Sequence, residues 1–69
     1  HRDMALVATL RTYLEQGTST SRTAAALYLH PNTVGLRLRR IEELIGVRLA
    51  DPEALLQVKA AFMAEDVTG

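Results

Sequence analysis

Pro31 constrains the fold of this chain more than any other residue. Proline disfavours helical backbone at the residue before it and lacks an N–H group, but its fixed φ suits the first position of a helix. It therefore predicts that one helix ends by Leu29, that His30 caps the next helix, and that this helix begins at Pro31. Residues 21–46 thus predict a short helix, a tight turn and a longer helix.

The longer helix is expected to cover about residues 31–45, with Gly46 as its left-handed stop. Apolar residues at spacings of four, three and four predict its buried face: Val34, Leu38, Ile41 and Ile45. The opposite face and its edges hold Asn32, Thr33, Gly35, Leu36, Arg39, Arg40 and Glu43. This arrangement is typical of a DNA-binding helix-turn-helix, in which the second helix enters the major groove.

Three shorter patterns predict the other helices. The first helix would be capped by Asp3 and ended by Gly17. Its apolar face would hold Leu6, Val7, Leu10, Tyr13 and Leu14, with Thr9, Arg11, Thr12 and Glu15 elsewhere. The second, over about residues 22–28, would be capped by Ser19 or Ser21. Ala24 or Ala25 would let the next helix cross closely, or would simply favour helix formation.

The fourth helix is predicted to begin at Asp51, Pro52 and Glu53, which supply a cap, a first-position proline and an acid near the helix start. Its buried face would hold Leu55, Val58 and Phe62, and Leu56 and Met63 extend the apolar surface. That width has two explanations. Either a small domain needs a wide face, or the helix also contacts another subunit.

These elements predict an all-α, four-helix domain containing a helix-turn-helix, which spans residues 1–69 and is part of a longer protein. The chain has no cysteine, which excludes disulfides and thiolate metal sites and fits a reducing compartment, so we expect it in the cytoplasm. No apolar run is long enough for a membrane span, and there is no signal peptide. No nucleophile with a base, paired carboxylates or phosphate loop suggests an enzyme or a cofactor, and His30 has no partner at metal-ligand spacing.

The charge balance bears on DNA binding in two ways. Eight basic and eight acidic residues give a net charge of zero, which counts against strong non-specific binding. Locally, however, five arginines stand against two glutamates between residues 22 and 48: Arg22, Arg37, Arg39, Arg40 and Arg48. This cluster is either a solvated helix face or a DNA contact surface.

We expect Asn32 and Arg39 to read bases, because their side chains can pair bidentately with adenine and guanine. Thr33 and the amides that begin the second and third helices would bind phosphates. Leu36 could touch a thymine methyl group, and Arg40 and Arg48 would hold the DNA backbone. Gly35 has two explanations. Either its missing side chain lets the helix lie closer to the DNA backbone, or the position has drifted and DNA binding has weakened.

The chain resembles the C-terminal helix-turn-helix of PucR-type bacterial transcription regulators. The residues that carry the resemblance are Leu10, Tyr13, Leu14, Glu15, Gly17, Thr23, Ala24, Leu27, His30, Asn32, Thr33, Arg37, Leu38, Arg39, Arg40, Ile41, Leu44, Gly46, Leu49, Asp51 and Pro52. Gly35 and Leu36 depart from the family pattern, which often has Arg or Ser and then an aromatic residue, and Pro31 replaces what is often a basic residue.

The resemblance implies a regulator whose N-terminal region senses a metabolite, such as a purine breakdown product or a sugar diacid. It places Asn32, Thr33, Arg37, Arg39 and Arg40 on the recognition helix. We expect the domain to bind duplex DNA as a homodimer. The alternative is a helical protein-interaction or dimerisation module that has lost DNA binding, which the zero net charge, Gly35 and Leu36 favour.

Overall fold

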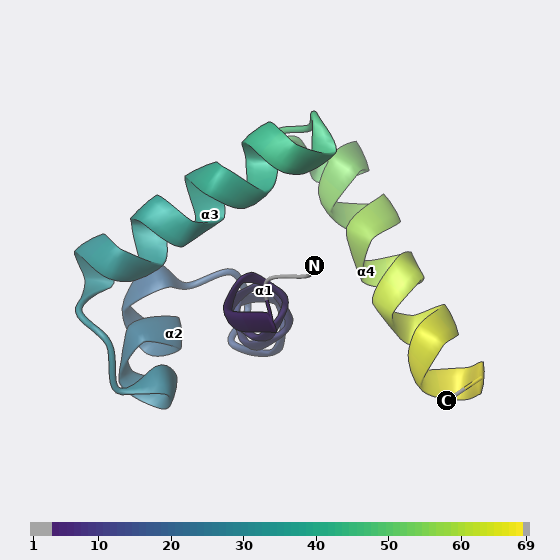
Figure 1. Cartoon of the computed structure of the whole chain (residues 1–69). Helices are drawn as coiled ribbons and strands as arrows, with labels where there is room; N and C mark the ends of the chain where they lie inside the picture. Colours follow the sequence, from purple (N-terminus) through teal and green to yellow (C-terminus); the bar gives the residue numbers. More distant parts are fainter. Residues whose placement is uncertain (1–3, 69) are drawn as a thin grey trace.

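The computed structural model describes the backbone of residues 4–68 and the side chains of residues 4–65. It contains four helices and no strand within that range (Figure 1): α1 (Met4–Glu15), α2 (Thr20–Leu27), α3 (Pro31–Ile45) and α4 (Pro52–Thr68). The all-α prediction and the bounds of α3 are therefore confirmed. None of the described helices is long and apolar enough to cross a membrane.

The first three helices pack against one another, and α4 joins them from one side. Each pair among α1, α2 and α3 is in contact. In Figure 1, α2 lies under the N-terminal end of α3, and α4 descends from the C-terminal end. α4 contacts the core through the three half-buried residues Leu55, Val58 and Phe62, as the sequence predicts. The upper side of α3 is left uncovered (Figure 1).

The core joins residues from α1, α2, α3 and the loop that follows α3. Its buried members are Leu10, Ala24, Val34, Leu38, Ile41 and Leu49. Ala24 is buried and Ala25 is exposed, so Ala24 is the small residue at the helix crossing. Leu56 and Met63 on α4 stay largely exposed, at 66% and 67%.

Three sequence predictions about burial are wrong. Val7, expected with the apolar face of α1, is 41% exposed. Ile45 is 47% exposed, because it is the last residue of α3 and the adjoining surface is an open hollow rather than a packed helix. Thr9, expected away from the apolar face, is fully buried. Burial is possible because its hydroxyl donates to the Ala5 carbonyl at 2.7 Å, which satisfies the polar group locally.

The start of α2 differs from the sequence prediction by two residues. Ser19 is the cap, and its hydroxyl accepts a hydrogen bond from the Arg22 amide at 3.1 Å. The helix therefore begins at Thr20 instead of residue 22. It ends at Leu27, one residue earlier than expected, because Tyr28 adopts the left-handed conformation with φ 57°.

The other described helix ends follow the sequence. His30 Nδ1 accepts a hydrogen bond from the Asn32 amide at 3.0 Å, which confirms His30 as the cap of α3. Gly46 ends that helix with φ 74°. Asp51 Oδ1 accepts from the Glu53 amide at 3.0 Å and caps α4. The predicted cap at Asp3 lies outside the described residues.

Candidate nucleic-acid interface

Residues 28–30 form the turn that sets α3 relative to α2. The Leu29 amide donates to the Ala24 carbonyl at 2.9 Å, and the Tyr28 amide donates to the Ala25 carbonyl at 3.3 Å. These bonds close the end of α2, and the His30 side chain closes the start of α3. Because Ala24 and Val34 are both buried in the shared core, the two helices are fixed on both sides of the turn.

The outer face of α3 is open to solvent along its length. Asn32, Leu36, Arg39 and Arg40 are exposed, and Thr33 and Gly35 are half-buried at its edge. Leu36 exposes 62% of its surface in the middle of this polar face. The structure therefore brings together most of the residues that the sequence predicts as DNA contacts.

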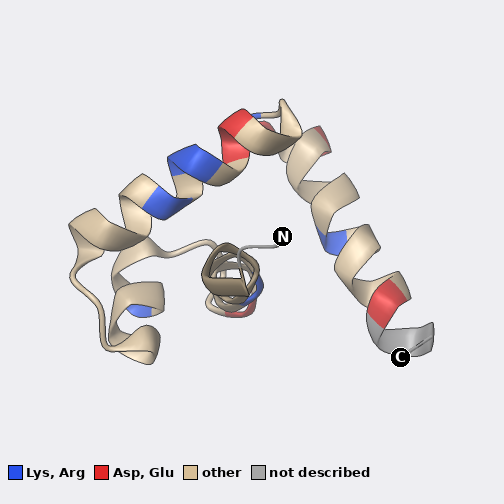
Figure 2. Ribbon diagram, in the orientation of Figure 1, with Lys and Arg blue, Asp and Glu red and all other residues tan. Residues whose placement is uncertain are grey.

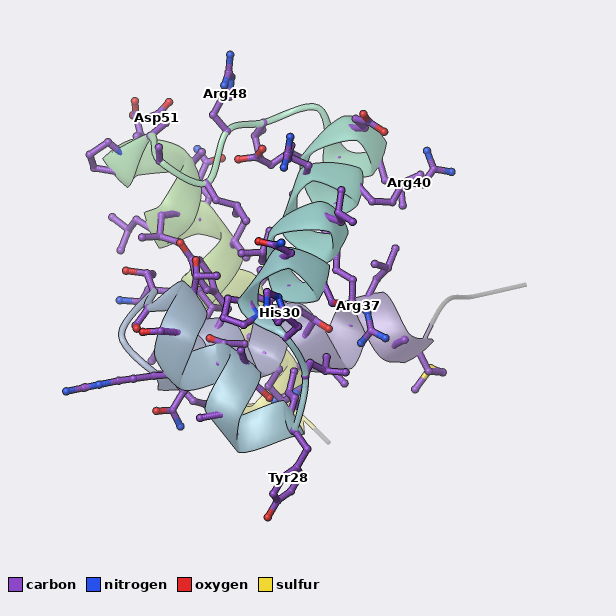
Figure 3. The ribbon with its side chains drawn as sticks, turned by 90° about the vertical axis from the view of Figure 1, so that its left-hand side faces the viewer. Tyr28, His30, Arg37, Arg40, Arg48 and Asp51 are labelled. Carbon is purple, nitrogen blue, oxygen red and sulfur yellow. The ribbon has the colours of Figure 1, made fainter. Side chains whose placement is uncertain are left out.

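Arg37 lies apart from that group. It is half-buried, and its Nη1 donates to Thr9 Oγ1 at 3.3 Å, which joins α3 to α1 (Figure 3). Figure 3 shows Arg40 and Arg48 extending from the surface in other directions. The contact with Thr9 makes Arg37 first of all a link within the domain.

Charge changes sign along α3. Figure 2 shows basic residues in the middle of the helix and acidic residues towards its C-terminal end. Arg40 Nη1 lies 3.4 Å from Glu43 Oε1, and both side chains are more than 60% exposed. Such exposed pairs contribute little stability, so Arg40 can exchange this carboxylate for a phosphate at small cost.

The amides at the start of α3 are already occupied, contrary to the predicted phosphate contact there. The Asn32 amide donates to the His30 side chain, and the Thr33 and Val34 amides donate to the His30 carbonyl. Pro31 has no N–H group. At the start of α2, Ser19 accepts from the Arg22 and Thr23 amides, which leaves the amides of Thr20 and Ser21 as the donors for an anion.

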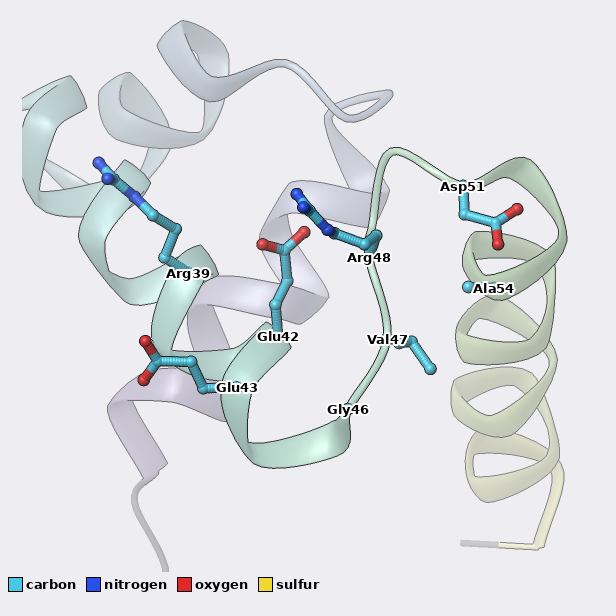
Figure 4. Close-up of a pocket in the computed structure, with 8 residues that line it drawn as sticks. All are labelled: Arg39, Glu42, Glu43, Gly46, Val47, Arg48, Asp51 and Ala54. Atoms are coloured by element: carbon cyan, nitrogen blue, oxygen red, sulfur yellow. The ribbon is translucent and has the colours of Figure 1, made fainter.

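A shallow hollow of about 580 Å³ lies beside the C-terminal half of α3 (Figure 4). Arg39 and Arg48 border it from α3 and from the α3–α4 loop, and their side chains extend to the same side with the Glu42 carboxylate between them. The sequence indicates both arginines but gives no sign that they share a hollow, because the loop path decides this. Within the described residues, no group of His, Asp and Glu could hold a metal ion.

Two helices joined by a fixed turn, the second with an open polar face bearing arginines, define a helix-turn-helix domain. Comparison with known proteins identifies the family of this helix-turn-helix domain. The chain belongs to the family of the PucR C-terminal helix-turn-helix domain, whose model matches residues 6–64. The family consists of the helix-turn-helix domains of transcription regulators, and the match confirms the resemblance carried by the sequence motifs.

Two relatives illustrate the context of the domain. The chain is 46% identical over 60 residues to the purine catabolism regulatory protein of Bacillus subtilis (strain 168), a match that covers 87% of this chain and 11% of that protein. It is 44% identical over 50 residues to the uncharacterized protein in pkwA 5'region of Thermomonospora curvata, covering 72% of this chain and 28% of that protein. The chain thus spans a small part of these relatives. No solved structure matches it.

Proposed function

We propose that this domain binds specific sequences of duplex DNA by placing α3 in the major groove, as the output domain of a bacterial transcription regulator. The observation that carries the proposal is the open outer face of α3, where Asn32, Leu36 and Arg39 are exposed together beyond a turn fixed by hydrogen bonds. An α-helix fits the major groove, where each base pair presents a distinct pattern of donors and acceptors.

The proposed roles follow from side-chain chemistry and position. Asn32 and Arg39 pair with base edges, and Leu36 packs on a thymine methyl group. Thr33, Arg40 and Arg48 contact the DNA backbone, together with Arg22 and the free amides at the start of α2. Arg37 can also contact a phosphate, because its guanidinium group has five N–H donors and one of them donates to Thr9. For Gly35 two roles are proposed as alternatives: either its missing side chain lets the helix lie close to the groove, or the position has drifted and DNA binding is weaker.

We propose that the functional form is a homodimer. One recognition helix reads few base pairs, and a domain with zero net charge has little non-specific affinity to add. Two copies would read half-sites about 34–36 Å apart, one turn of DNA. The exposed Leu56 and Met63 on α4 are the candidate contact between copies.

The rest of the regulator is proposed from its relatives. They extend well beyond the matched segment, and the name of one connects it with purine catabolism. We propose a sensor region N-terminal to this domain that responds to a metabolite, in a protein located in the cytoplasm.

Selection of bound sequences from a random duplex pool tests the proposal. DNA binding predicts enrichment of one short motif, and the parent protein should bind that motif far more tightly than a scrambled duplex at low salt. The alternative function, a helical module that contacts only proteins, predicts no enrichment. Its support is the apolar surface of α4 around Leu56 and Met63.

A further inference from the structure

Within the described part of the chain, the Glu42 side chain joins α3 to the loop that follows it by a hydrogen bond. Its Oε2 accepts a hydrogen bond from the backbone amide of Leu49 at 2.8 Å, seven residues further along the chain. Glu42 is half-buried, and the Leu49 side chain is buried in the core. The backbone at Leu49 is therefore held by both its amide and its side chain.

This anchor determines the position of Arg48, the residue immediately before Leu49. The Arg48 carbonyl accepts a hydrogen bond from the Asp51 amide at 3.1 Å, so the loop is also fixed on the far side of Arg48. The Arg48 side chain itself is exposed. In Figure 4 it extends to the same side as Arg39, across the Glu42 carboxylate.

The charge and the hydrogen bond of Glu42 have opposite effects on a bound phosphate. A carboxylate beside two arginines weakens their attraction for another anion. A loop held by a charge-assisted hydrogen bond instead presents Arg48 from a fixed backbone, which lowers the entropy lost when that long side chain binds. The two effects can be separated by experiment because they depend on different properties of one side chain.

We propose that Glu42 is a positioning residue for DNA binding: through its hydrogen bond to Leu49 it fixes the α3–α4 loop so that Arg48 contacts a DNA phosphate beside the base contact of Arg39. The inference rests on the proposed DNA-binding function and adds the α3–α4 loop to the interface. The charge of Glu42 opposes binding, and its hydrogen bond supports it.

Two conservative variants separate these effects. E42D keeps the charge but is shorter by one methylene, so its carboxylate falls short of the Leu49 amide. E42Q keeps the length and an acceptor oxygen but loses the charge. We expect E42D to weaken binding to a selected duplex about two- to tenfold, the cost of immobilising one long side chain. E42Q should bind as tightly as the parent protein or more tightly.

Arg48 and Glu53 provide the matched controls. In the R48A background, E42D should cause no further loss, because the residue that it positions is gone. Glu53 is an exposed acid on α4, and among the described residues its side chain has no hydrogen bond to the loop, so E53D should bind like the parent. Hydrogen exchange of the Leu49 amide in the free domain should speed up in E42D while core amides such as that of Leu38 stay protected.

The outcomes that overturn the proposal are distinct. A loss of affinity in E42Q with none in E42D would show that the charge matters and the hydrogen bond does not. Additive losses from E42D and R48A would show that Glu42 acts independently of Arg48. If E42D does not fold, a loss of affinity in E42Q alone still refutes the proposal. A parent protein that binds no selected duplex refutes the proposed function itself, whereas binding by the parent with an unchanged E42D refutes only this inference.

Discussion

At the scale of single residues, the two neighbouring arginines of α3 serve as a test of assigned roles. Arg39 borders the hollow beside the loop, whereas Arg40 is paired with Glu43 on the surface. Arg39→Ala should cost about 1–3 kcal/mol at the best DNA site and relax specificity at one position. Arg40→Ala should weaken all sequences alike and reduce the salt slope by about one. Affinities on matched and single-mismatch duplexes measure both, and two variants that bind like the parent contradict the assignment.

Gly35 offers a second test at this scale. A Cβ atom at Gly35 meets no other atom within 4 Å, so the domain itself has room for a side chain. Replacing a helix-interior glycine gains up to about 1 kcal/mol in helix propensity. If the position reflects drift, Gly35→Arg should raise both the melting temperature and the DNA affinity, with a steeper salt dependence from the added cation.

The measurements for Gly35→Arg are thermal melting and DNA affinity at two salt concentrations. The free domain has space for a Cβ atom at this position, and an unchanged or raised melting temperature would show that the arginine fits the free domain. A variant that is more stable but no longer binds DNA would therefore show that close approach to the groove explains the glycine.

At the scale of elements, the helix ends were predictable and the exceptions have local causes. Pro31, Gly46 and Asp51 determine helix ends through their own backbone conformation or a hydrogen bond in the first turn. These ends can therefore be predicted from the residue types alone. The start of α2 was ambiguous because Ser19 and Ser21 can both cap, and the hydrogen bond to the Arg22 amide selects Ser19. The left-handed backbone at Tyr28 was not predictable, because the residues usual in that conformation are glycine and asparagine.

The candidate site was predictable where it lies on one helix and not where separate segments meet. The exposed face of α3 follows from helical periodicity alone. The burial of Thr9 requires the neighbouring helix α3, whose Arg37 donates to it. Likewise, the bond from Leu49 to Glu42 depends on how the loop folds back, and no spacing rule contains it.

The turn between α2 and α3 carries a prediction of its own. Tyr28 has φ 57° and is 95% exposed, so its ring offsets little of the cost of left-handed backbone. That cost is about 1 kcal/mol for a residue other than glycine. Tyr28→Gly should therefore raise the free energy of unfolding by up to about 1 kcal/mol in a urea titration. Tyr28→Val, with a β-branched side chain at the same φ, should lower it, and a destabilised glycine variant would show that the ring makes a stabilising contact.

At the scale of the whole molecule, α4 is attached differently from the other helices. Arg11 on α1 pairs with Glu65 at 3.2 Å and lies 4.7 Å from the centre of the Phe62 ring. Leu56 and Met63 remain exposed on the same helix. The packing of α4 thus leaves a free apolar surface, which suits a contact between two copies.

Two-fold binding gives a prediction about the DNA itself. Selected sequences should contain an inverted repeat with half-site centres one helical turn apart, about 34–36 Å. Replacing both Leu56 and Met63 with glutamine should weaken the cooperativity of binding and leave the melting temperature nearly unchanged, because both side chains are exposed. An enriched site without an inverted repeat, even for the full-length regulator, contradicts the two-fold arrangement.

The central claim is that α3 reads base edges in the major groove, and methylation interference on a selected duplex tests it most directly. Dimethyl sulfate methylates guanine N7 in the major groove and adenine N3 in the minor groove. Because Arg39 is proposed to pair with guanine O6 and N7, N7 methylation at one guanine in each half-site should prevent binding by the parent protein. In Arg39→Ala that interference should disappear at the same guanine. Interference confined to adenine N3, or unchanged at that guanine in the variant, would contradict the account.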